Sequence, residues 1–436
     1  MSMRSSWRGG TDRRADTDQV RRHNRALVLA AIRRKAPIAR VDLGPETQLS
    51  PATITAITAD LIAENIVETV TLESETESDG GRRRTGGRGR PRVLLQLNRE
   101  TAFVLAVKIT TNRMMLVLAD YLGTVAARRS LVLDTLRETT DSFPRTLIAA
   151  VTDFLVAERI DLSAVAEIGI AAQGVVDTNR GTLVWSPAFS VRDIALVAPV
   201  EAAFGTACFI SNDGNMIAQA LNWSDPVTYG GTFAVIFADY GVGMGLFVGG
   251  RLHAGADGSA AELGHVNHIP GGPRCSCGRR GCLEAFTADY AILREARGLP
   301  PDTDPQEIRP DLDELLAIEE AARAGDVRLA GIYDRAGVAL GYGLARLMAI
   351  VNPSRIVFTG ASARAFSLIE TGMRSGLEDA LVEALRRNTV IETRPFDQDL
   401  VVAGLVADAL GRLDRDVFAL PEAARQSTGE MSEVTP

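Results

Sequence analysis

Three of the four cysteines in this chain lie within residues 275–282, and this cluster constrains the fold more than any other feature. Cys275, Cys277 and Cys282 are preceded by His265. Cysteine thiolates and imidazole nitrogens are the usual ligands of a four-coordinate Zn²⁺, and a zinc ion with four protein ligands has a structural role. The alternatives are three buried cysteines or a disulfide, but a bridge between Cys275 and Cys277 would be strained because one residue separates them. The cluster therefore predicts a structural zinc site, with Zn²⁺ as cofactor.

The segment that holds this cluster resembles the signature of the ROK family. The match runs through Glu262-Leu-Gly-His265, nine further residues, and then Cys275-Ser-Cys277-Gly-Arg-Arg-Gly-Cys282-Leu-Glu284. That family contains repressors and sugar kinases with the actin-like ATPase fold. The resemblance implies that the histidine and the three cysteines bind zinc, and that three of the matched side chains face a sugar: Glu262, His265 and Glu284. His268 lies close enough in the sequence to compete with His265 as a zinc ligand.

The length and composition are typical of a cytoplasmic protein with more than one domain. A chain of 436 residues is expected to form two or three hydrophobic cores. It contains 4 cysteines and no apolar run of about 20 residues, which argues against secretion, a disulfide scaffold or a membrane span. The N-terminus is charged and lacks the apolar segment of a signal peptide, so we expect residues 1–19 to form a disordered arm.

The charge is unevenly distributed along the chain. Residues 1–92 contain 17 Lys and Arg and 12 Asp and Glu, which gives a net charge of +5. Because the whole chain carries −8, the remainder carries −13. A basic N-terminal part on an acidic body indicates that only the N-terminal part binds a polyanion. Double-stranded DNA is such a polyanion.

Residues 20–92 have the pattern of a winged helix-turn-helix domain. Apolar residues recur at helical spacing over 24–34, residues 38–43 favour a second short helix, and a third helix follows. Ser50 can cap this third helix, because its hydroxyl accepts a backbone N–H and the next residue, a proline, suits the first turn. We expect the third helix to enter the major groove, with Ser50, Thr53 and Thr55 near its exposed start. A plain three-helix bundle is the alternative.

An arginine-rich segment lies between two predicted strands of this N-terminal part. Residues 65–72 and 93–97 are strand-like, and residues 80–92 contain six arginines and no acidic residue. Arg88-Gly-Arg90 matches the core of a minor-groove arginine hook, since arginine gains from the negative potential of a narrow A·T groove. We therefore expect Arg88 and Arg90 to bind DNA from a wing, as in the repressor branch of the ROK family, which this part resembles. A solvated linker is the alternative.

The rest of the chain has an α/β pattern, and its order of elements resembles the two-lobed actin-like fold of the ROK family. Strands are predicted at 102–109, 114–119, 130–133 and 166–171, with a helix over 143–160. We expect lobe 1 to span residues 93–230, and lobe 2, with the zinc-binding loop, to span 231–399. A helix near 400–415 is expected to complete lobe 1, and residues 416–436 to form a C-terminal tail.

The residues at the expected phosphate loop argue against a kinase. ROK kinases have an acidic, glycine-rich hairpin at this place, whereas this chain reads Lys108-Ile-Thr-Thr-Asn112. The β-branched side chains keep backbone N–H groups away from a polyphosphate, and no carboxylate remains to help hold Mg²⁺. Residues 241–245 keep three glycines but lack the threonine hydroxyl typical of kinases, so we interpret them as a hairpin at the hinge. We therefore expect no enzymatic activity and assign no catalytic residue.

The sugar-binding side matches the family better. Asn212 and Asp213 match an asparagine and an aspartate at a strand end, and in the kinases that aspartate is the general base. Without a phosphate donor, Asp213 is expected to accept a hydrogen bond from a sugar hydroxyl. Gln173 stands where the family usually has proline, which leaves the identity of the ligand open. Trp185 and Trp223 are candidates for stacking on a sugar, although such residues more often belong to a core.

These observations together predict a sugar-responsive DNA-binding regulator of the repressor type. Its expected partners are a double-stranded DNA operator, further copies of the chain in a homodimer or homotetramer, and a sugar effector held by Asn212, Asp213, Glu262, His265 and Glu284. Sugar binding is expected to close the lobes and change the spacing of two heads. One alternative is an active ROK-type sugar kinase with an extra DNA-binding domain, and another is a regulator whose effector is a protein.

Overall fold

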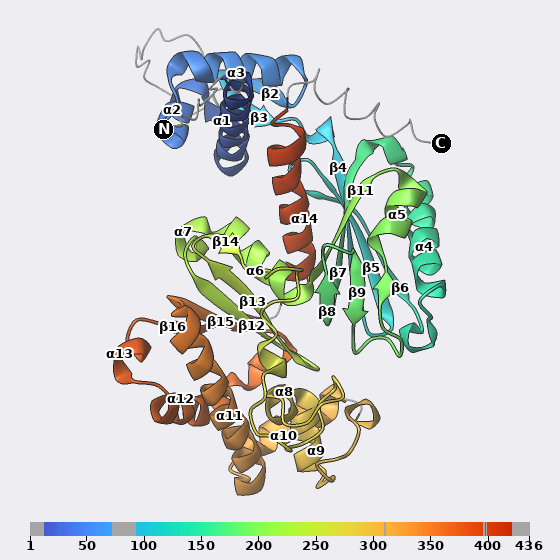
Figure 1. Ribbon diagram of the computed structural model, residues 1–436, viewed down its shortest axis with the longest axis vertical. Helices are drawn as coiled ribbons and strands as arrows, with labels where there is room; N and C mark the ends of the chain where they lie inside the picture. Colours follow the sequence, from blue (N-terminus) through green and yellow to red (C-terminus); the bar gives the residue numbers. More distant parts are fainter. Residues whose placement is uncertain (1–12, 72–92, 309–310, 396, 398, 421–436) are drawn as a thin grey trace, which may run out of the picture.

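The computed structural model describes residues 13–71, 93–308, 311–395, 397 and 399–420. Figure 1 shows a head at one end of the molecule, lobe 1 beside it and lobe 2 at the opposite end. Helix α14 (Leu400–Arg412) extends from the head towards the junction of the two lobes. None of the helices in the described ranges is long and apolar enough to cross a membrane.

The head consists of helices packed on a small antiparallel sheet of order β1-β3-β2. Its elements are α1 (Arg13–Lys35), β1 (Ile38–Ala39), the 3-10 turn η1 (Arg40–Asp42), α2 (Leu43–Thr47), α3 (Pro51–Ala63), β2 (Val67–Thr71) and β3 (Val93–Leu97). The apolar positions at helical spacing face inwards, so that Leu29, Ile32, Leu43, Leu61 and Leu95 are fully buried in one core.

Three boundaries in the head differ from the sequence-based expectations. Helix α1 begins at Arg13, within the residues 1–19 expected to form a disordered arm. The second helical segment, expected over 38–43, is shifted along the chain, because Ile38 and Ala39 pair with β3 and the 3-10 turn η1 and helix α2 follow over 40–47. Strand β3 pairs with both β1 and β2, so the head extends to Leu97 and does not end at residue 92. Pairing between strands that lie far apart in sequence leaves no local pattern to detect.

Lobe 1 is built on a five-stranded sheet of order β11-β7-β4-β5-β6. Helices α4 and α5 cover one face, and α6 and α14 cover the other. Its elements are β4 (Phe103–Thr110), β5 (Arg113–Asp120), β6 (Val125–Val132), α4 (Ser142–Glu158), β7 (Val165–Ala172), β8 (Val175–Asp177), β9 (Thr182–Trp185), β10 (Ile194–Ala195), α5 (Val197–Phe204), β11 (Ala207–Asn212), α6 (Asp213–Ser224) and α7 (Pro226–Tyr229). The strands predicted at 102–109, 114–119 and 166–171 coincide with β4, β5 and β7 to within one residue at each end, whereas the strand predicted at 130–133 overlaps only the last residues of β6, which begins at Val125.

Lobe 2 has a second five-stranded sheet, of order β14-β13-β12-β15-β16. Its elements are β12 (Phe233–Ala238), β13 (Val242–Val248), β14 (Arg251–Leu252), α8 (Glu284–Thr287), α9 (Asp289–Ala296), α10 (Leu312–Arg323), α11 (Val327–Val351), β15 (Arg355–Thr359), α12 (Phe366–Ala380), α13 (Glu383–Arg386) and β16 (Val390–Thr393). The cysteine-rich loop lies between β14 and α8. Each lobe has its own hydrophobic core, as the length of the chain indicated.

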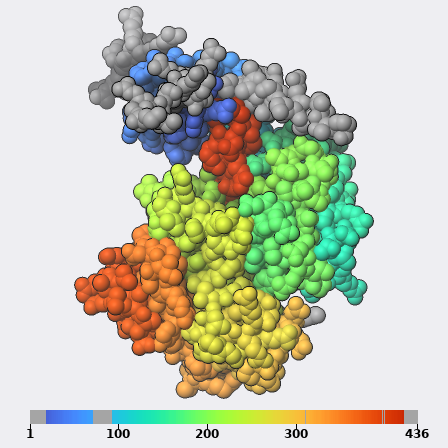
Figure 2. Space-filling model, viewed as in Figure 1, coloured from blue at the N-terminus to red at the C-terminus, as the bar shows by residue number. Residues whose placement is uncertain are grey.

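The two lobes meet along one side of the molecule, where lobe 1 (green) and lobe 2 (yellow) lie side by side in Figure 2. The N–H of Thr178 donates to the Asp257 carbonyl at 2.6 Å, and Asn179 Nδ2 donates to the Ala256 carbonyl at 3.0 Å. Helix α14 returns to lobe 1 at the end of the chain, which agrees with the expected final helix. A π-helical turn, η8 (Leu413–Val417), continues from it to the head.

Candidate functional site

The five residues predicted to bind a sugar line one pocket between the lobes: Asn212, Asp213, Glu262, His265 and Glu284. Lobe 1 contributes the end of β11 and the start of α6, whereas lobe 2 contributes the residues around the cysteine-rich loop. Carboxylates, an imidazole and an amide offer both acceptors and donors, which suits the hydroxyl groups of a neutral ligand. The fold therefore brings together side chains that are up to 72 residues apart in sequence.

Asn212 and Asp213 lie where strand β11 passes directly into helix α6. Asn212 caps the helix, since its Oδ1 accepts the N–H of Gly214 at 2.7 Å while its Nδ2 donates to the Gly174 carbonyl at 2.7 Å. Burial raises the pKa of Asp213 to about 6, against the hydrogen bond from Gly214 and the charge of Lys108. Asp213 is thus mostly ionised at neutral pH and can accept a hydrogen bond from a hydroxyl.

His265 lies between the pocket and the cysteines. Its Nδ1 is 3.5 Å from Sγ of Cys275, whereas its Nε2 is 4.0 Å from Oε2 of Glu262. Burial raises the pKa of Glu262 to about 7, against the opposing charge of His265. One ring nitrogen therefore faces the sulfur atoms and the other faces the pocket, so this side chain is placed for both roles that the family resemblance implies.

The three cysteines and His265 lie close enough together to hold one metal ion. Their ligand atoms all lie within 4.8 Å of one another. The sulfur atoms of Cys277 and Cys282 are 3.8 Å apart, which matches the separation of about 3.8 Å expected for two ligands on bonds of about 2.3 Å to Zn²⁺. No disulfide forms, since all four cysteines are free. The pKa of Cys277 falls to about 3 through hydrogen bonds with Cys275 and His265, against burial.

Backbone pairing shapes the loop that carries this group and sets His268 apart from it. Asn267 pairs with Cys282 and Arg274 with Arg280, as isolated antiparallel bridges. The imidazole of His268 packs edge-on against Phe286, with ring centroids 5.0 Å apart, and is not part of the metal-ligand group. Of the two candidate histidines, the geometry therefore favours His265.

Glu284 is the most firmly held carboxylate of the pocket. Its Oε2 accepts the N–H of Val242 at 3.1 Å, and its Oε1 accepts the hydroxyl of Tyr290 at 3.2 Å and that of Ser276. Ser276 lies between two of the clustered cysteines, so Glu284 ties the cysteine-rich loop to the hairpin of β12 and β13. Because protein donors occupy much of its accepting capacity, Glu284 fixes the pocket wall more than it offers free oxygens.

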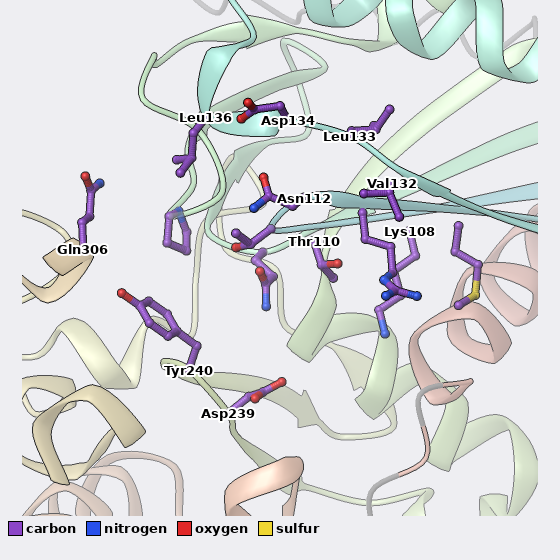
Figure 3. Close-up of a pocket in the computed structure, with 15 residues that line it drawn as sticks. Lys108, Thr110, Asn112, Val132, Leu133, Asp134, Leu136, Asp239, Tyr240 and Gln306 are labelled. Carbon is purple, nitrogen blue, oxygen red and sulfur yellow. The ribbon is translucent and has the colours of Figure 1, made fainter. Parts of the chain in front are cut away.

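A larger cavity of about 930 Å³ adjoins this pocket on the side of the β4–β5 hairpin. Figure 3 shows Lys108, Thr110 and Asn112 of the hairpin on one side of it, and Asp239 and Tyr240 of lobe 2 on the other. Its volume is within the range of small-molecule sites. This hairpin is the segment for which the sequence predicts a degenerate phosphate loop.

Lys108 places a positive charge at the β4 side of this hairpin. Burial lowers the pKa of Lys108, and the carboxylates of Asp213 and Asp239 oppose this change. Its β4 neighbour Thr110 pairs with Arg113 across the hairpin, and Asn112 adopts a left-handed φ of 57° at the turn. The backbone N–H of Asn112 donates to Thr135 Oγ1 at 3.0 Å, which joins this turn to the residues that follow β6.

Two of the three glycines in residues 241–245 are required for close packing around the pocket. A Cβ at Gly245 would lie 2.1 Å from the Gly214 carbonyl oxygen of α6, and one at Gly241 would lie 2.7 Å from Oε2 of Glu284. Neither approach tolerates a side chain. These contacts agree with the interpretation of this segment as a hairpin at the hinge, which holds β13 against the helix that begins at Asp213.

At the other end of the molecule, helix α3 presents a small-residue face to solvent. Ser50 caps this helix as predicted, since its Oγ accepts the N–H of Thr53 at 3.2 Å. Thr53 is partly buried and its hydroxyl bonds that of Ser50, whereas Thr55 is exposed on the helix surface. The exposed positions on this helix are Pro51, Ala52, Thr55, Ala56, Ala59 and Ala63. Arg88 and Arg90 lie outside the described residues.

Comparison of the chain with known proteins identifies its family. The model for the ROK family matches residues 104–410, which span both lobes. The chain belongs to the ROK family. This confirms the resemblance that the sequence around His265 and the cysteines indicated.

Similar proteins include three bacterial regulators. The chain is 25% identical over 389 residues to the DNA-binding transcriptional dual regulator NagC of Escherichia coli, covering 89% of this chain and 93% of NagC. It is 26% identical over 399 residues to the DNA-binding transcriptional repressor Mlc of Escherichia coli, with 90% and 95% covered. It is 24% identical over 395 residues to the xylose repressor of Bacillus subtilis, with 90% and 96% covered. Each similarity covers almost the whole of both chains.

Solved structures show the same relationship. A ROK family transcriptional regulator, a homologue of the Escherichia coli Mlc protein, superposes with a TM-score of 0.73 at 26% identity, covering 92% of this chain and 99% of that chain. A ROK family glucokinase from Streptomyces griseus superposes with a TM-score of 0.53 at 24% identity, covering 71% of this chain and 98% of that chain. The glucokinase shares the fold of the body.

Within this ROK body, the sequence did not predict every residue that lines the pocket, and one predicted candidate lies elsewhere. Trp185 lines the pocket and packs edge-on against His265, with ring centroids 5.4 Å apart, but Trp223 lies near Arg33 of the head instead. Tyr240 and Ser276 line the pocket without having been predicted. Ser276 could have been found from its place between two cysteines, whereas nothing local marks Tyr240.

Proposed function

We propose that the protein is a sugar-responsive DNA-binding transcriptional regulator of the repressor type. The observation that carries this proposal is the combination, in one chain, of a head with a solvent-facing α3 and a body with a polar pocket between its lobes. The regulators NagC, Mlc and the xylose repressor resemble the chain over about nine tenths of its length, which includes the head. A sugar effector and an operator are the partners that this combination suits.

The head acts as a winged helix-turn-helix domain in this proposal. Helix α2, the three residues 48–50 and helix α3 form the helix-turn-helix, and α3 enters the major groove. The exposed Thr55 and the alanines beside it can contact base edges and thymine methyl groups, while Ser50 and Thr53 hold the first turn. Strands β2 and β3 form the stem of the wing, and Arg88 and Arg90, which lie between these strands in the sequence, contact the minor groove in this proposal.

The pocket between the lobes binds the effector through Asn212, Asp213, Glu262, His265 and Glu284. Asp213 and Glu262 accept hydrogen bonds from sugar hydroxyls, and Trp185 offers an apolar face beside them. Because residues from both lobes line this pocket, a bound sugar favours closure of the lobes. A protein effector would need no such pocket, which makes the sugar the better-supported partner.

The body binds sugar without phosphorylating it. The chain has Lys108 in place of an acid and the β-branched Thr110 and Thr111 in place of glycines, so the hairpin lacks both a carboxylate for Mg²⁺ and open backbone N–H groups. Asp213 therefore serves as a hydrogen-bond acceptor and not as a general base.

The metal in the cysteine-rich loop is a structural Zn²⁺ held by His265, Cys275, Cys277 and Cys282. A bound zinc ion cross-links the loop and neutralises its thiolates. The chain's own contribution is to orient His265 towards the pocket and to hold Ser276 against Glu284. The chains assemble into a homodimer or homotetramer, so that two heads reach two half-sites of an operator.

The proposal is tested by sugar binding, operator binding and ATP turnover on the full-length protein. A thermal-shift screen of hexoses, pentoses and N-acetylhexosamines should identify a sugar that stabilises the protein and alters its affinity for the operator. A coupled ADP-release assay with that sugar should show no turnover. Asp213→Asn should weaken sugar binding and leave DNA binding in place, with the exposed Asp161→Asn as the matched control. Turnover of about one per second, lost in Asp213→Asn, would instead identify a kinase.

A further inference from the structure

The head is held to lobe 1 by a buried cluster of polar side chains that lies outside both the pocket and the surface of α3. Arg33, in the last turn of α1, donates from Nε and Nη2 to the two carboxylate oxygens of Asp414, at 2.7 and 2.8 Å. Its Nη1 donates to the Tyr121 carbonyl at 2.6 Å, and the Tyr121 hydroxyl donates to Asp414 Oδ1 at 2.6 Å. The Arg33 and Asp414 side chains are each 6% exposed. Both oxygens of the Asp414 carboxylate thus accept hydrogen bonds from protein groups, and the side chain is almost completely buried.

A second buried arginine joins helix α3 to the same C-terminal segment. Arg25 Nε donates to the Phe418 carbonyl at 2.6 Å, and its Nη2 pairs with the carboxylate of Glu64. Glu64 is the C-cap residue of α3. The ring of Phe418 packs edge-on against Tyr121 of lobe 1, with centroids 5.0 Å apart. Residues 413–418 therefore contact α1 directly and α3 through Arg25.

The segment that carries Asp414 connects directly to the sugar pocket through packed helices. Asp414 follows α14, and α14 packs closely along α6, where a Cβ at Gly404 would lie 1.9 Å from the Met216 carbonyl oxygen. Helix α6 begins at Asp213, at the floor of the pocket. Figure 1 shows α14 as the helix between the head and α6. The packed helices α6 and α14 thus run from the pocket in lobe 1 to the head.

These contacts restrict the orientation of the head more than they stabilise the fold. A buried ion pair gains little net free energy, because the loss of hydration offsets the attraction between the charges. A bidentate arginine–carboxylate pair does fix a planar geometry. Arg33 makes such a pair across the junction, whereas Arg25 adds one hydrogen bond to the Phe418 carbonyl and forms its ion pair with Glu64 inside the head. A rotation of the head relative to lobe 1 would break these hydrogen bonds.

We propose that the head and lobe 1 move as one rigid body, and that Arg33, Arg25 and Asp414 are positioning residues that carry lobe closure to helix α3. The part of this proposal that concerns the effector rests on the proposed function. The hinge then lies between the lobes and not between head and body, so the effector moves α3 relative to lobe 2.

Distances between spin labels on the full-length protein test the rigid body directly. Non-canonical amino acids carry the labels at three exposed valines: Val41 in the head, Val156 in lobe 1 and Val327 in lobe 2. Labelled chains are diluted with unlabelled chains, and glucose, xylose and N-acetylglucosamine serve as probes. The head–lobe 1 distance should be narrow and unchanged by any sugar. A broad distribution in the wild-type protein, or a narrow one in Arg33→Met, would overturn the proposal.

The distance between the labels in lobe 1 and lobe 2 tests the effector response separately from the rigid body. This distance should change when a sugar binds. If no sugar changes it, the proposed effector response is wrong, while the head–lobe 1 distance still tests whether head and lobe 1 move together. The coupling is then measured as the ratio of operator Kd values with and without the sugar. Asp414→Asn should bring this ratio within about twofold of one, whereas the exposed Asp416→Asn should keep it. An unchanged ratio in a folded Asp414→Asn variant would contradict the positioning role.

Arg33→Lys provides a second variant in case Asp414→Asn does not fold. Lysine keeps the charge but cannot make both the bidentate pair with Asp414 and the hydrogen bond to the Tyr121 carbonyl. It should therefore broaden the head–lobe 1 distance and lower the ratio while sugar affinity in the absence of DNA stays within about twofold. Wild-type coupling in Arg33→Lys would show that the charge alone suffices, against the proposal.

Discussion

His265 is the residue at which the metal group and the polar pocket share one side chain. Its Nδ1 faces the cysteines and its Nε2 faces Glu262. An imidazole that binds a metal through one nitrogen is held in a single orientation, which fixes the direction of the other nitrogen. A metal bound in this loop would thus fix the orientation of His265 at the pocket wall.

Replacing Cys277 by serine should remove the metal and loosen the pocket. We expect zinc in elemental analysis of the wild-type protein and none in Cys277→Ser, with an unfolding temperature lower by about 5–10 °C, since a loss of a few kcal/mol has about this effect in a domain of this size. Sugar binding should be lost together with the metal. Cys208→Ser, in β11 and outside the group, is the control and should keep both. Full sugar binding in a zinc-free wild-type protein would contradict this role.

The pH dependence of sugar affinity should report the ionisation of Asp213. Its pKa is raised to about 6, so the carboxylate is lost as the pH falls through this value, and this loss by itself should lower the affinity about tenfold between about pH 7.5 and about pH 5. Glu262, with a pKa raised to about 7, adds a second change at higher pH. The raised pKa of Asp213 also means that its contribution to folding stability decreases as the pH rises from about 4 to about 6.

Isothermal titration across this pH range checks the assignment. Asp213→Asn should bind sugar more weakly at every pH and should lack the change near pH 6, while the change due to Glu262 persists. An unaltered pH profile in Asp213→Asn would assign the titration to another group.

At the scale of elements, the proposed DNA contacts are of two kinds. One kind is made by helix α3 and the other by the segment between strands β2 and β3. In the proposed function, side chains on α3 read base edges, whereas arginines of the segment between the strands bind the backbone or the minor groove. These two kinds of contact respond differently to salt, because each neutralised phosphate releases counterions.

Arg90→Ala should therefore weaken DNA binding to many sequences by a similar factor. The slope of log K against log salt concentration should become shallower by about one unit, while the base preference of the site stays the same. Thr55→Ala should do the reverse, with altered base preference and an unchanged slope. Arg137→Ala, exposed on lobe 1, is the matched loss of charge and should leave both unchanged. Fluorescence anisotropy over a salt series measures these slopes.

At the scale of the whole molecule, the head, lobe 1 and α14 form a continuous structure, and lobe 2 meets it across the pocket. A regulator of this kind needs two heads at a fixed spacing, since a helix-turn-helix dimer reads two half-sites about one helical turn apart or a multiple of it. Assembly of the chain is thus part of the proposed function.

Analytical ultracentrifugation should give a mass of two or four times the 46.6 kDa of the chain. Nuclease protection of the operator should show two half-sites on one face of the DNA. Asp414→Asn should keep the mass, because its site lies inside one chain, but should alter protection when sugar is present. A monomer that protects a single site with full affinity would argue against a spacing mechanism.

The sequence by itself predicted the family, and this assignment is confirmed. It also predicted one cysteine–histidine group and five pocket residues, and the structure brings each of these two sets together, while metal binding and ligand binding stay predictions. These features were readable because each is a short run of uncommon residue types: cysteines at fixed spacing, Asn212-Asp213 after a strand, and Ser50 before a proline. The regular elements of lobe 1 were predictable as well, since strands and helices bury apolar side chains at characteristic periods. The DNA contacts of Arg88 and Arg90, and sugar binding itself, stay predictions.

Only the tertiary structure decided how these parts are joined. The pairing of β1 with β3 and the buried contacts of Arg33 with Asp414 and of Arg25 with Phe418 link residues that lie more than fifty positions apart, so no local period or motif records them. The same holds for the choice of His265 over His268, which depended on where each imidazole points. Hydrogen-bond geometry and burial are properties of the assembled chain, and they set the orientation of the head on the body.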